Sequence, residues 1–246
     1  MKPRAILITG SAKRLGRELA LESARMGFAV IAHFRTSRSA VLSLGTEVRK
    51  LGVPFFPIQA DLSKNPDKLI RACVKLPVRL IGLVNNASVF EKGDLLQRNE
   101  ARGTRREAGF WQMFQVNAFA PLILSTSFFK QSPASRLAPR SFIINLLDAN
   151  IDGFNRNFQL YRISKRLLRE FTVECAALFA PKVRVNAIAP GAILPSRFNK
   201  RPGQTWGTIA GLLKAFRYLV ESEATGQIMY CDQGLRLFKQ GTPWTL

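Results

Sequence analysis

Residues 4–16 read RAILITGSAKRLG, and this stretch decides the fold. Its first part, Arg4–Thr9, is a short apolar run that is typical of a buried strand. A turn bounded by Gly10 and Gly16 follows, and over Leu15–Met26 small and apolar residues recur at helical spacing until a glycine ends the pattern. A strand, a glycine-bounded turn and a helix in this order can direct backbone N–H groups at a pyrophosphate. By itself the turn is a weak signal, because ordinary strand-to-helix loops also carry glycines.

The same alternation of apolar strands and amphipathic helices continues along the chain. It is typical of a parallel sheet covered by helices on both faces. We therefore predict an α/β fold, a single Rossmann-type doubly wound domain over residues 1–246 with a sheet of about seven parallel strands. The further strands are predicted at Ala29–His33, Phe55–Gln59, Leu80–Val84, Phe142–Leu147, Val183–Ile188 and Gln227–Cys231. The further helices are predicted at Ala40–Leu51, Asp67–Lys75, Ala108–Phe129, Phe158–Phe179 and Thr208–Val220.

Three segments lie outside this alternation. Lys92–Arg106 is polar and charge-dense, and it predicts an exposed excursion. Leu194–Gly207 contains two prolines, two glycines and three basic residues, and it predicts a mobile loop next to the substrate. The stretch Asp152–Gln159 carries Arg156 and Phe158, which either line a pocket or belong to a solvated loop.

The composition narrows the class of protein. With 246 residues, of which 47% are hydrophobic, the chain has enough apolar side chains for the core of one large domain. No apolar run approaches the roughly 18 residues that a membrane span needs, and the opening Met-Lys-Pro-Arg does not lead into a signal peptide. We therefore expect a cytoplasmic protein that does not bind a membrane.

Cysteine and histidine usage excludes several kinds of site. Cys73, Cys175 and Cys231 lie far apart and form no CxxC pair, so neither a disulfide framework nor a zinc knuckle is indicated. His33 is the single histidine, which makes a Ser-His-Asp triad or a multi-histidine metal site hard to build. We expect no metal.

The chain is strongly basic. Its 37 Lys and Arg against 16 Asp and Glu give a formal net charge of +21, which would attract polyanions. The basic residues are scattered, however, and no zinc-finger, KH or RNP pattern accompanies them. Nucleic acid is therefore not the favoured partner, and the alternative is a field that favours phosphorylated small-molecule ligands.

The sequence YRISK at residues 161–165 is a candidate for proton transfer. It places the phenol of Tyr161 and the ammonium of Lys165 on one helix face. A free tyrosine has a pKa of about 10, which an adjacent cation lowers by favouring the phenolate. The spacing alone occurs often by chance.

Taken together, these motifs resemble the short-chain dehydrogenase/reductase family over nearly the whole chain. The matching elements occur in the family's order and spacing. They are TGSAKRLG at 9–16, Asp61-Leu62, NNAS at 85–88, Asn117, YRISK at 161–165, VNAIAPG at 185–191, and Gly226 with Asp232-Gln233-Gly234.

The resemblance implies a role for each matching residue. The pyrophosphate would be held by Gly10, Arg14, Leu15 and Gly16, the adenine edge by Asp61 and Leu62, and the adenosine ribose region by Asn86 and Ala87. Pro190 and Gly191 would border the nicotinamide. Lys165 would bind the nicotinamide ribose and lower the pKa of Tyr161, the proton donor, while Asn117 would support a proton relay through a water.

Two departures from the family pattern narrow the substrate. Arg14 stands at the usual middle glycine, and Asp148 replaces the usual active-site serine thirteen residues before Tyr161. Both resemble the pteridine reductase branch, which includes dihydromonapterin reductases. A carboxylate such as Asp148 can contact the ring nitrogens and exocyclic amine of a pterin and share a proton network with Tyr161. Phe90 would stack on that planar ring, or else is a packing aromatic.

The residues at the end of the second strand predict the cofactor. Sites for NAD usually place an acidic residue there, whereas this chain offers His33, Arg35, Ser37 and Arg38. Cations and hydroxyls suit a 2′-phosphate, so we expect NADPH. The alternative is that Arg35 and Arg38 only begin a solvated helix.

The sequence leaves alternatives to pterin reduction with NADPH. One is an NADPH-dependent carbonyl reductase acting on a ketone or quinone. Another, of a different class, is a non-catalytic NADPH-binding or nucleic-acid-binding protein on the same fold. The resemblance also implies that the helices Ala108–Phe129 and Phe158–Phe179 pair across a two-fold axis in a dimer or tetramer.

Overall fold

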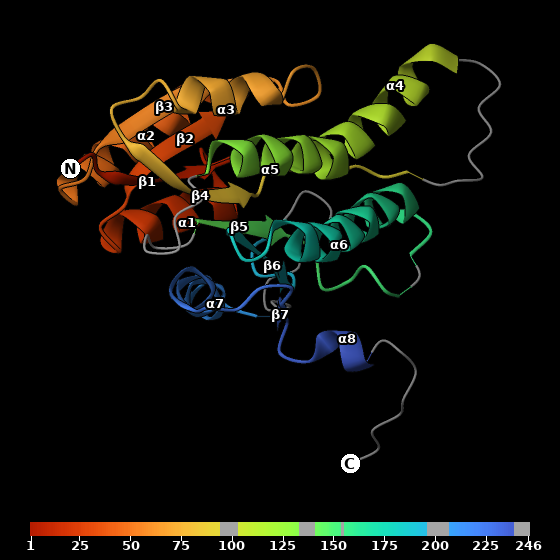
Figure 1. Ribbon diagram of the computed structural model, residues 1–246. Helices are drawn as coiled ribbons and strands as arrows, with labels where there is room; N and C mark the ends of the chain where they lie inside the picture. The colour runs from red at the N-terminus through yellow and green to blue at the C-terminus, as the bar shows by residue number, and fades with distance from the viewer. Residues whose placement is uncertain (94–102, 133–140, 154, 196–206, 239–246) are drawn as a thin grey trace.

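The computed structural model describes residues 1–93, 103–132, 141–153, 155–195 and 207–238, and Figure 1 draws the remaining residues as a thin grey trace. One sheet of seven parallel strands organises these residues, in the order β3-β2-β1-β4-β5-β6-β7. The strands are β1 Arg4–Ile8, β2 Ala29–Phe34, β3 Phe55–Gln59, β4 Arg79–Asn85, β5 Ser141–Leu146, β6 Val183–Pro190 and β7 Ile228–Cys231. The predicted doubly wound fold is therefore confirmed, with strand ends that differ from the predicted ones by one or two residues.

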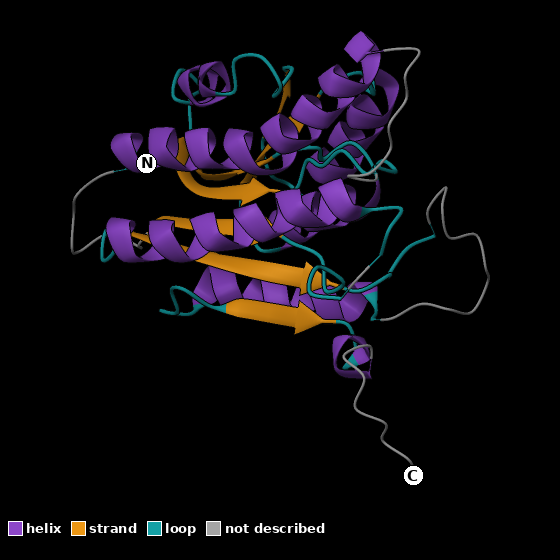
Figure 2. Ribbon diagram, turned by 90° about the vertical axis from the view of Figure 1, so that its right-hand side faces the viewer, coloured by secondary structure: helices purple, strands orange, loops and turns teal. Residues whose placement is uncertain are grey.

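Helices cover both faces of this sheet (Figure 2). They are α1 Arg14–Arg25, α2 Arg38–Lys50, α3 Asp67–Cys73, α4 Gly103–Phe114, the π-helix η1 Gln115–Phe119, α5 Ala120–Gln131, α6 Gln159–Phe179, α7 Ile209–Glu221 and α8 Leu235–Phe238. On one face, α1, α2 and α7 supply buried apolar side chains such as Leu19, Leu44 and Phe216. On the other face α3, α5 and α6 do so, and α5 lies beside α6 (Figure 1).

The strand β1 shows how the two cores follow from the sequence. Ile6 and Ile8 belong to the cluster under α1, α2 and α7, whereas Ala5 and Leu7 belong to the cluster under α3, α5 and α6. Successive side chains of a strand point to opposite faces, so a strand that is buried on both faces is apolar throughout. The continuous run AILI at residues 5–8 is this case.

The segment before η1 corrects one prediction. We predicted an exposed excursion to Arg106 and one long helix from Ala108 to Phe129, but α4 begins at Gly103 and a π-helix separates it from α5. The start of α4 is dense in charged residues, so its sequence shows no helical pattern of apolar residues. Within the π-helix, the side chain of Asn117 forms hydrogen bonds with Val89 and Ser164. Residues 94–102 of the predicted excursion lie outside the described part of the chain.

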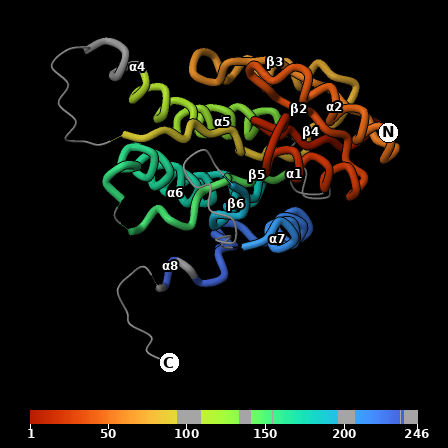
Figure 3. The backbone as a smooth tube through the Cα atoms, turned by 180° about the vertical axis from the view of Figure 1, so that it is seen from behind, coloured from red at the N-terminus to blue at the C-terminus, as the bar shows by residue number. Residues whose placement is uncertain are grey.

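The elements β6, α7 and β7 of the second half occur where they were predicted. Thr208 caps α7 through its hydroxyl, which accepts a hydrogen bond from the N–H of Gly211 at 2.9 Å. The short helix α8 was not predicted, and the view from behind places it beyond β6, away from α2 (Figure 3). Most of the predicted loop 194–207 falls outside the described residues. Among the helices that are described, none is long and apolar enough to cross a membrane.

The order of the strands locates the ligand site. The chain runs outward from β1 to β2 and β3, and then returns to place β4 on the other side of β1. Such a reversal leaves a crevice at the carboxyl ends of the two central strands, which is where open α/β sheets bind their ligands. The turns after β1 and β4 lie at this point, and so do the glycine turn and the NNAS motif.

Candidate active site

Close approach of two backbones builds the glycine turn. Gly10 has a φ of +63°, and a Cβ on this residue would lie 3.0 Å from the Cα of Ala87 in the turn after β4. A Cβ on Gly16 would overlap both the side-chain nitrogen of Asn86 and the carbonyl oxygen of Gly10. Both positions therefore require glycine, because the helix α1 begins pressed against the neighbouring strand end.

Buried side chains hold this turn in place. The imidazole Nδ1 of His33 accepts a hydrogen bond from the N–H of Gly10 at 3.1 Å, and its Nε2 lies 3.1 Å from the carbonyl of Ala60. Burial lowers the pKa of His33, which favours the neutral ring that this acceptor role needs. The side chain of Asn86 donates to the carbonyls of Thr9 and Gly10 at 2.9 and 3.1 Å. His33 and Asn86 thus shape the predicted cofactor site from beneath.

Arg14 is the unusual residue of the turn. It has a φ of +56° although it is not a glycine, so its backbone occupies the left-handed region that most residues avoid. Its guanidinium donates to the carbonyl of Pro195 at 2.6 Å, across the cleft from the turn. The family glycine that Arg14 replaces would adopt this conformation without strain, so the side chain is held there at a conformational cost.

The end of β2 and the turn after β3 form the far wall. Arg35 is exposed and lines the cleft together with Asp61 and Leu62. The carboxylate of Asp61 accepts hydrogen bonds from the N–H and hydroxyl of Ser63 at 3.0 and 2.7 Å, and these bonds lower its pKa, as Arg35 does by its charge. This wall therefore presents a cation, as a 2′-phosphate requires. Ser37 precedes α2 and does not line the cleft.

One cleft of about 1500 Å³ joins the glycine turn to the segment that contains Tyr161. Of the residues predicted for the site, all but Ser37, Arg38 and Asn117 line it. Pro190 and Gly191 lie at the end of β6 along this cleft. An extended dinucleotide fits such a site, because glycines allow close approach at one end and the helix N-terminus faces the cleft.

Tyr161 and Asp148 are directly hydrogen-bonded. The hydroxyl of Tyr161 donates to Oδ2 of Asp148 at 3.0 Å. Burial, and after it the charge and hydrogen bond of Asp148, raise the pKa of Tyr161 well above its ordinary value. The expectation that Lys165 lowers this pKa is therefore not met in the chain by itself, because burial and Asp148 dominate. Tyr161 stays a protonated phenol at neutral pH.

Lys165 is buried one helical turn further along α6, with 2% of its surface exposed. Its ammonium donates to the carbonyl of Leu146 at 2.6 Å at the end of β5. Burial lowers the pKa of Lys165 from 10.5 to about 8, while the charge of Asp148 acts in the opposite direction. The ammonium form still prevails at pH 7, so a cation and a carboxylate both stand near the phenol.

Asn117 lies in η1 behind the cleft wall. Its side-chain oxygen accepts from the N–H of Val89 at 2.7 Å and from the hydroxyl of Ser88 at 3.1 Å, and its nitrogen donates to Ser164 at 3.0 Å. The side chain is thus committed to holding the turn after β4 against α6. The predicted water relay at Asn117 therefore stays a prediction.

Ser88 belongs to the site although sequence analysis gave it no role, and Phe158, for which a place in a pocket was one of two alternatives, lines the cleft. An interaction with the Ser88 hydroxyl acts to lower the pKa of Tyr161, against the larger effects of burial and Asp148. The ring of Phe158 stacks on Phe90 with centroids 4.7 Å apart and planes at 9°, and Phe90 also meets Tyr161 edge to face at 4.7 Å. In the chain by itself, a ring therefore already lies parallel to Phe90, where a planar substrate was predicted.

Comparisons with known proteins find one matching family and several similar reductases. A family model described as short chain dehydrogenase matches residues 4–205. Among curated proteins, pteridine reductase 1 of Leishmania tarentolae is 27% identical over 221 residues, covering 77% of this chain and 76% of its own. L-xylulose reductase of Caenorhabditis elegans is 27% identical over 202 residues, covering 78% and 72%. Among solved structures, alternative dihydrofolate reductase 1 of Brucella canis, complexed with NADP, has a TM-score of 0.85 and 28% identity over 98% of this chain and 97% of that one.

Proposed function

The chain belongs to the short-chain dehydrogenase family and is an oxidoreductase of that family; from this premise, we propose that it reduces a pterin or dihydropterin with NADPH. The observation that carries the substrate class is the hydrogen bond between Tyr161 and Asp148. Similarity to a pteridine reductase and to an alternative dihydrofolate reductase complexed with NADP supports the same choice.

The proposal assigns NADPH to the cleft between the glycine turn and Lys165. Gly10, Leu15 and Gly16 would hold the pyrophosphate, and Arg35 would pair with the 2′-phosphate. When bound, NADPH supplies the hydride. NADPH is a nicotinamide dinucleotide with a 2′-phosphate on its adenosine ribose, and this choice agrees with the NADP in the Brucella structure.

Tyr161 would be the proton donor of the reduction. Its raised pKa keeps the hydroxyl protonated at neutral pH, as a proton donor requires. When Tyr161 releases its proton to a ring nitrogen, the ammonium of Lys165 offsets the charge of the resulting phenolate. Asp148 accepts from Tyr161 before that transfer, and its carboxylate can accept from an exocyclic amine of the substrate.

The aromatic residues would recognise a flat ring. Phe90 and Phe158 both line the cleft and lie stacked within reach of Tyr161. A planar heterocycle gains by offset stacking on such a ring, at about 0.5–1.5 kcal/mol beyond the burial of its area. The proposal therefore requires Phe158 to leave Phe90 when the substrate stacks there.

A carbonyl reductase is the second candidate function. The similarity to L-xylulose reductase, at the same 27% identity, favours it, and the pair of Tyr161 and Lys165 would serve a ketone equally well. The two candidates differ at Asp148, because a carbonyl oxygen accepts a hydrogen bond and an ionised carboxylate cannot donate one.

The experiment that separates the two is NADPH oxidation by the purified chain with dihydrobiopterin, dihydromonapterin and a panel of ketones. We expect turnover with a pterin and little with the ketones. The variant Asp148→Ser restores the family's usual residue, and we expect it to lose pterin turnover by more than about tenfold while ketone turnover is kept or rises. Turnover of ketones alone, by the unaltered chain, would refute the pterin assignment.

We also propose that the chain assembles through α4, α5 and α6. Large apolar side chains are exposed along these elements, at Trp111 in α4, Phe119 in η1, Ile123 in α5, and Val173 and Leu178 in α6. The proposal takes these five side chains to form one surface, because exposed apolar side chains that gather together often mark an interface. Light scattering should give the mass of a dimer or tetramer, and Leu178→Glu should shift it towards the monomer; a monomeric unaltered chain would refute this assembly.

A further inference from the structure

A buried arginine lies next to Tyr161 in the sequence. Only 4% of Arg162 is exposed, and its guanidinium donates to the carbonyl of Asn150 through Nε and to that of Ile151 through Nη2, both at 2.9 Å. Burial lowers the pKa of Arg162 and the charge of Arg166 adds to this, while Asp148 and Asp152 oppose it. A buried cation is costly unless it is hydrogen-bonded, so the carbonyls of Asn150 and Ile151 are what allow the guanidinium of Arg162 to be buried.

The carbonyls that Arg162 holds belong to the turn that fixes Asp148. The N–H of Asn150 donates to Oδ1 of Asp148 at 2.7 Å, and the side-chain nitrogen of Asn150 does so at 3.2 Å. On the other side of the turn, the N–H of Ala149 donates to the carbonyl of Pro190 at 2.9 Å. With Oδ1 engaged by Asn150, Oδ2 is the oxygen that accepts from Tyr161.

The charges around Asp148 come from α6. Among the described residues, Arg162 and Lys165 are cations whose charges act on this carboxylate, and Tyr161 donates a hydrogen bond to it, as Asn150 does from the turn. Lys165 meets the cleft, whereas Arg162 does not line it. Arg162 therefore reaches the reacting groups only through the turn and through its charge.

We propose that Arg162 is a positioning residue for this reaction: by holding the carbonyls of Asn150 and Ile151, it keeps the Asp148 carboxylate on the hydroxyl of Tyr161. The inference rests on the proposed function, in which Asp148 takes part in pterin reduction. It goes beyond that function by assigning a catalytic consequence to a residue outside the cleft.

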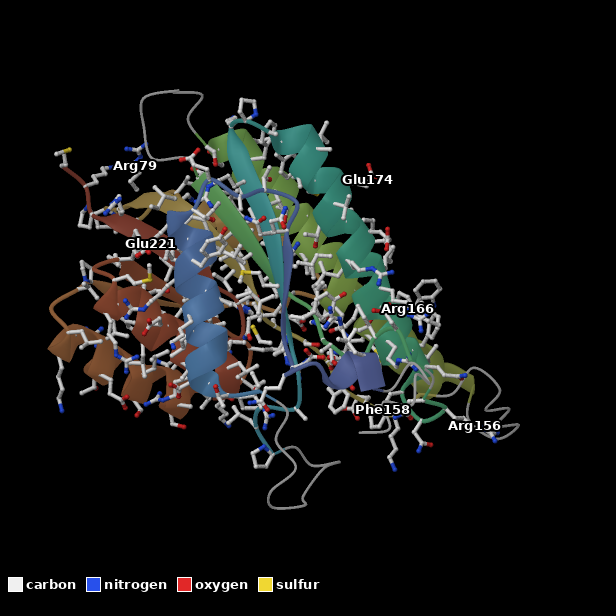
Figure 4. All side chains as sticks on the ribbon, turned by 90° about the horizontal axis from the view of Figure 1, so that it is seen from below. Arg79, Arg156, Phe158, Arg166, Glu174 and Glu221 are labelled. Carbon is white, nitrogen blue, oxygen red and sulfur yellow. The ribbon has the colours of Figure 1, made fainter. Side chains whose placement is uncertain are left out.

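The chain offers a matched control in Arg166. Its Nε donates to the same carbonyl of Ile151 at 2.7 Å, but no hydrogen bond from Arg166 to Asn150 occurs among those resolved in the described chain. Figure 4 shows Arg166 on α6, near the end of the molecule where Phe158 lies. Replacing either arginine removes support from the turn, but only Arg162 holds the residue that contacts Asp148.

The test is a double-mutant cycle measured by NADPH oxidation with the preferred pterin. We expect Arg162→Met to lower kcat by about tenfold or more and Arg162→Lys to recover part of it, because a positioned acid–base group contributes about 10²- to 10⁴-fold. Arg166→Met should lower kcat by less than about threefold. In the Asp148→Ser background, measured with the same pterin, Arg162→Met should have almost no further effect on kcat, since coupled residues are not additive. The Kd of NADPH should stay constant throughout.

Two outcomes would overturn the proposal. One is an equal loss of kcat from Arg162→Met in both backgrounds, and the other is a loss from Arg166→Met that matches it; either would make the arginines general supports of the turn. Should Arg162→Met fail to fold, Arg162→Lys takes its place in the cycle, and unchanged kcat there overturns the proposal too.

A second readout separates this proposal from the proposed function. Hydrogen exchange at the N–H of Asn150, measured by NMR, should accelerate in Arg162→Met and not in Arg166→Met, whether or not pterins are substrates. A chain that shows this acceleration but turns over no pterin would refute the proposed function and retain Arg162 as the residue that holds Asp148. Unchanged exchange in Arg162→Met would overturn the inference itself.

Discussion

Replacing Lys165 with methionine should stabilise the fold while it removes activity. Lys165 is buried at 2% exposure, and its ammonium is held by the carbonyl of Leu146. A methionine of similar length fills the same space without a charge. Because the charge is needed near the phenol of Tyr161, the side chain stays in the fold at a cost to stability.

The expected gain in the free energy of unfolding follows from the pKa of Lys165. Burial lowers it from 10.5 to about 8, and each pKa unit corresponds to about 1.4 kcal/mol, so the charged side chain costs about 3 kcal/mol at neutral pH. Losing the hydrogen bond to Leu146 offsets about 1 kcal/mol of the gain. We therefore expect Lys165→Met to be more stable by about 2 kcal/mol, which raises Tm by about 4–8 °C in a domain of this size.

The sign of the pH dependence is a further check. Between pH 8 and 10.5 the unfolded chain keeps a proton on Lys165 that the folded chain has lost, so stability of the unaltered chain rises with pH there. Below pH 8 both forms are protonated and the full penalty applies. The advantage of Lys165→Met should therefore be constant below pH 8 and vanish as pH approaches 10.5.

Urea unfolding of both proteins at several pH values measures this difference, and NADPH oxidation measures the loss of activity. Lys165→Leu serves as a second apolar replacement. A variant that is less stable than the unaltered chain at pH 7, or an advantage that grows from pH 8 to 10.5, would refute the reasoning that the buried ammonium is unfavourable.

Three further predictions concern the cleft. Tyr161→Phe keeps the ring and removes the proton, so turnover should fall by about 10²- to 10⁴-fold with an unchanged Kd for NADPH; preserved turnover would remove Tyr161 as the donor. Arg35→Glu should weaken NADPH by about tenfold or more and leave NADH unaffected, as measured by fluorescence titration, because an ion pair with the 2′-phosphate is replaced by repulsion; equal weakening of both cofactors would place the 2′-phosphate elsewhere. Gly16→Ala should abolish cofactor binding, since its Cβ would overlap Asn86 and the carbonyl of Gly10, and tight binding by this variant would contradict the close approach of the two turns.

The strand-turn-helix unit at the start of the chain was predictable because its signals are local. The apolar run of β1, the glycines and the periodicity of α1 each depend on neighbours in the sequence. The beginning of α4 was not predictable in the same way, because Gly103 and the surrounding charges read as a loop. The π-helix around Asn117 depends on Val89 and Ser164, which are distant in the sequence.

The candidate site was also predictable only in part. The resemblance to the family, with Asp148 at the position of its usual serine, implied that Asp148, Tyr161 and Lys165 would meet, and the structure brings all three to one cleft. The direction of the pKa shift of Tyr161 was not foreseeable, since it depends on burial and on which oxygen of Asp148 is occupied. Arg162 gave no signal either, because a helical arginine usually reads as a solvated residue.

The central claim is that the chain reduces a pterin with NADPH at a site where a phenol is paired with a carboxylate. Stopped-flow measurement of NADPH oxidation with dihydrobiopterin tests it most directly, by comparing the unaltered chain with Asp148→Ser. We expect the unaltered chain to oxidise NADPH rapidly and Asp148→Ser to do so more than about tenfold more slowly, because serine lacks the carboxylate that would contact the pterin ring. Equal rates for the two proteins, or no oxidation by the unaltered chain under conditions where it binds NADPH, would contradict the claim.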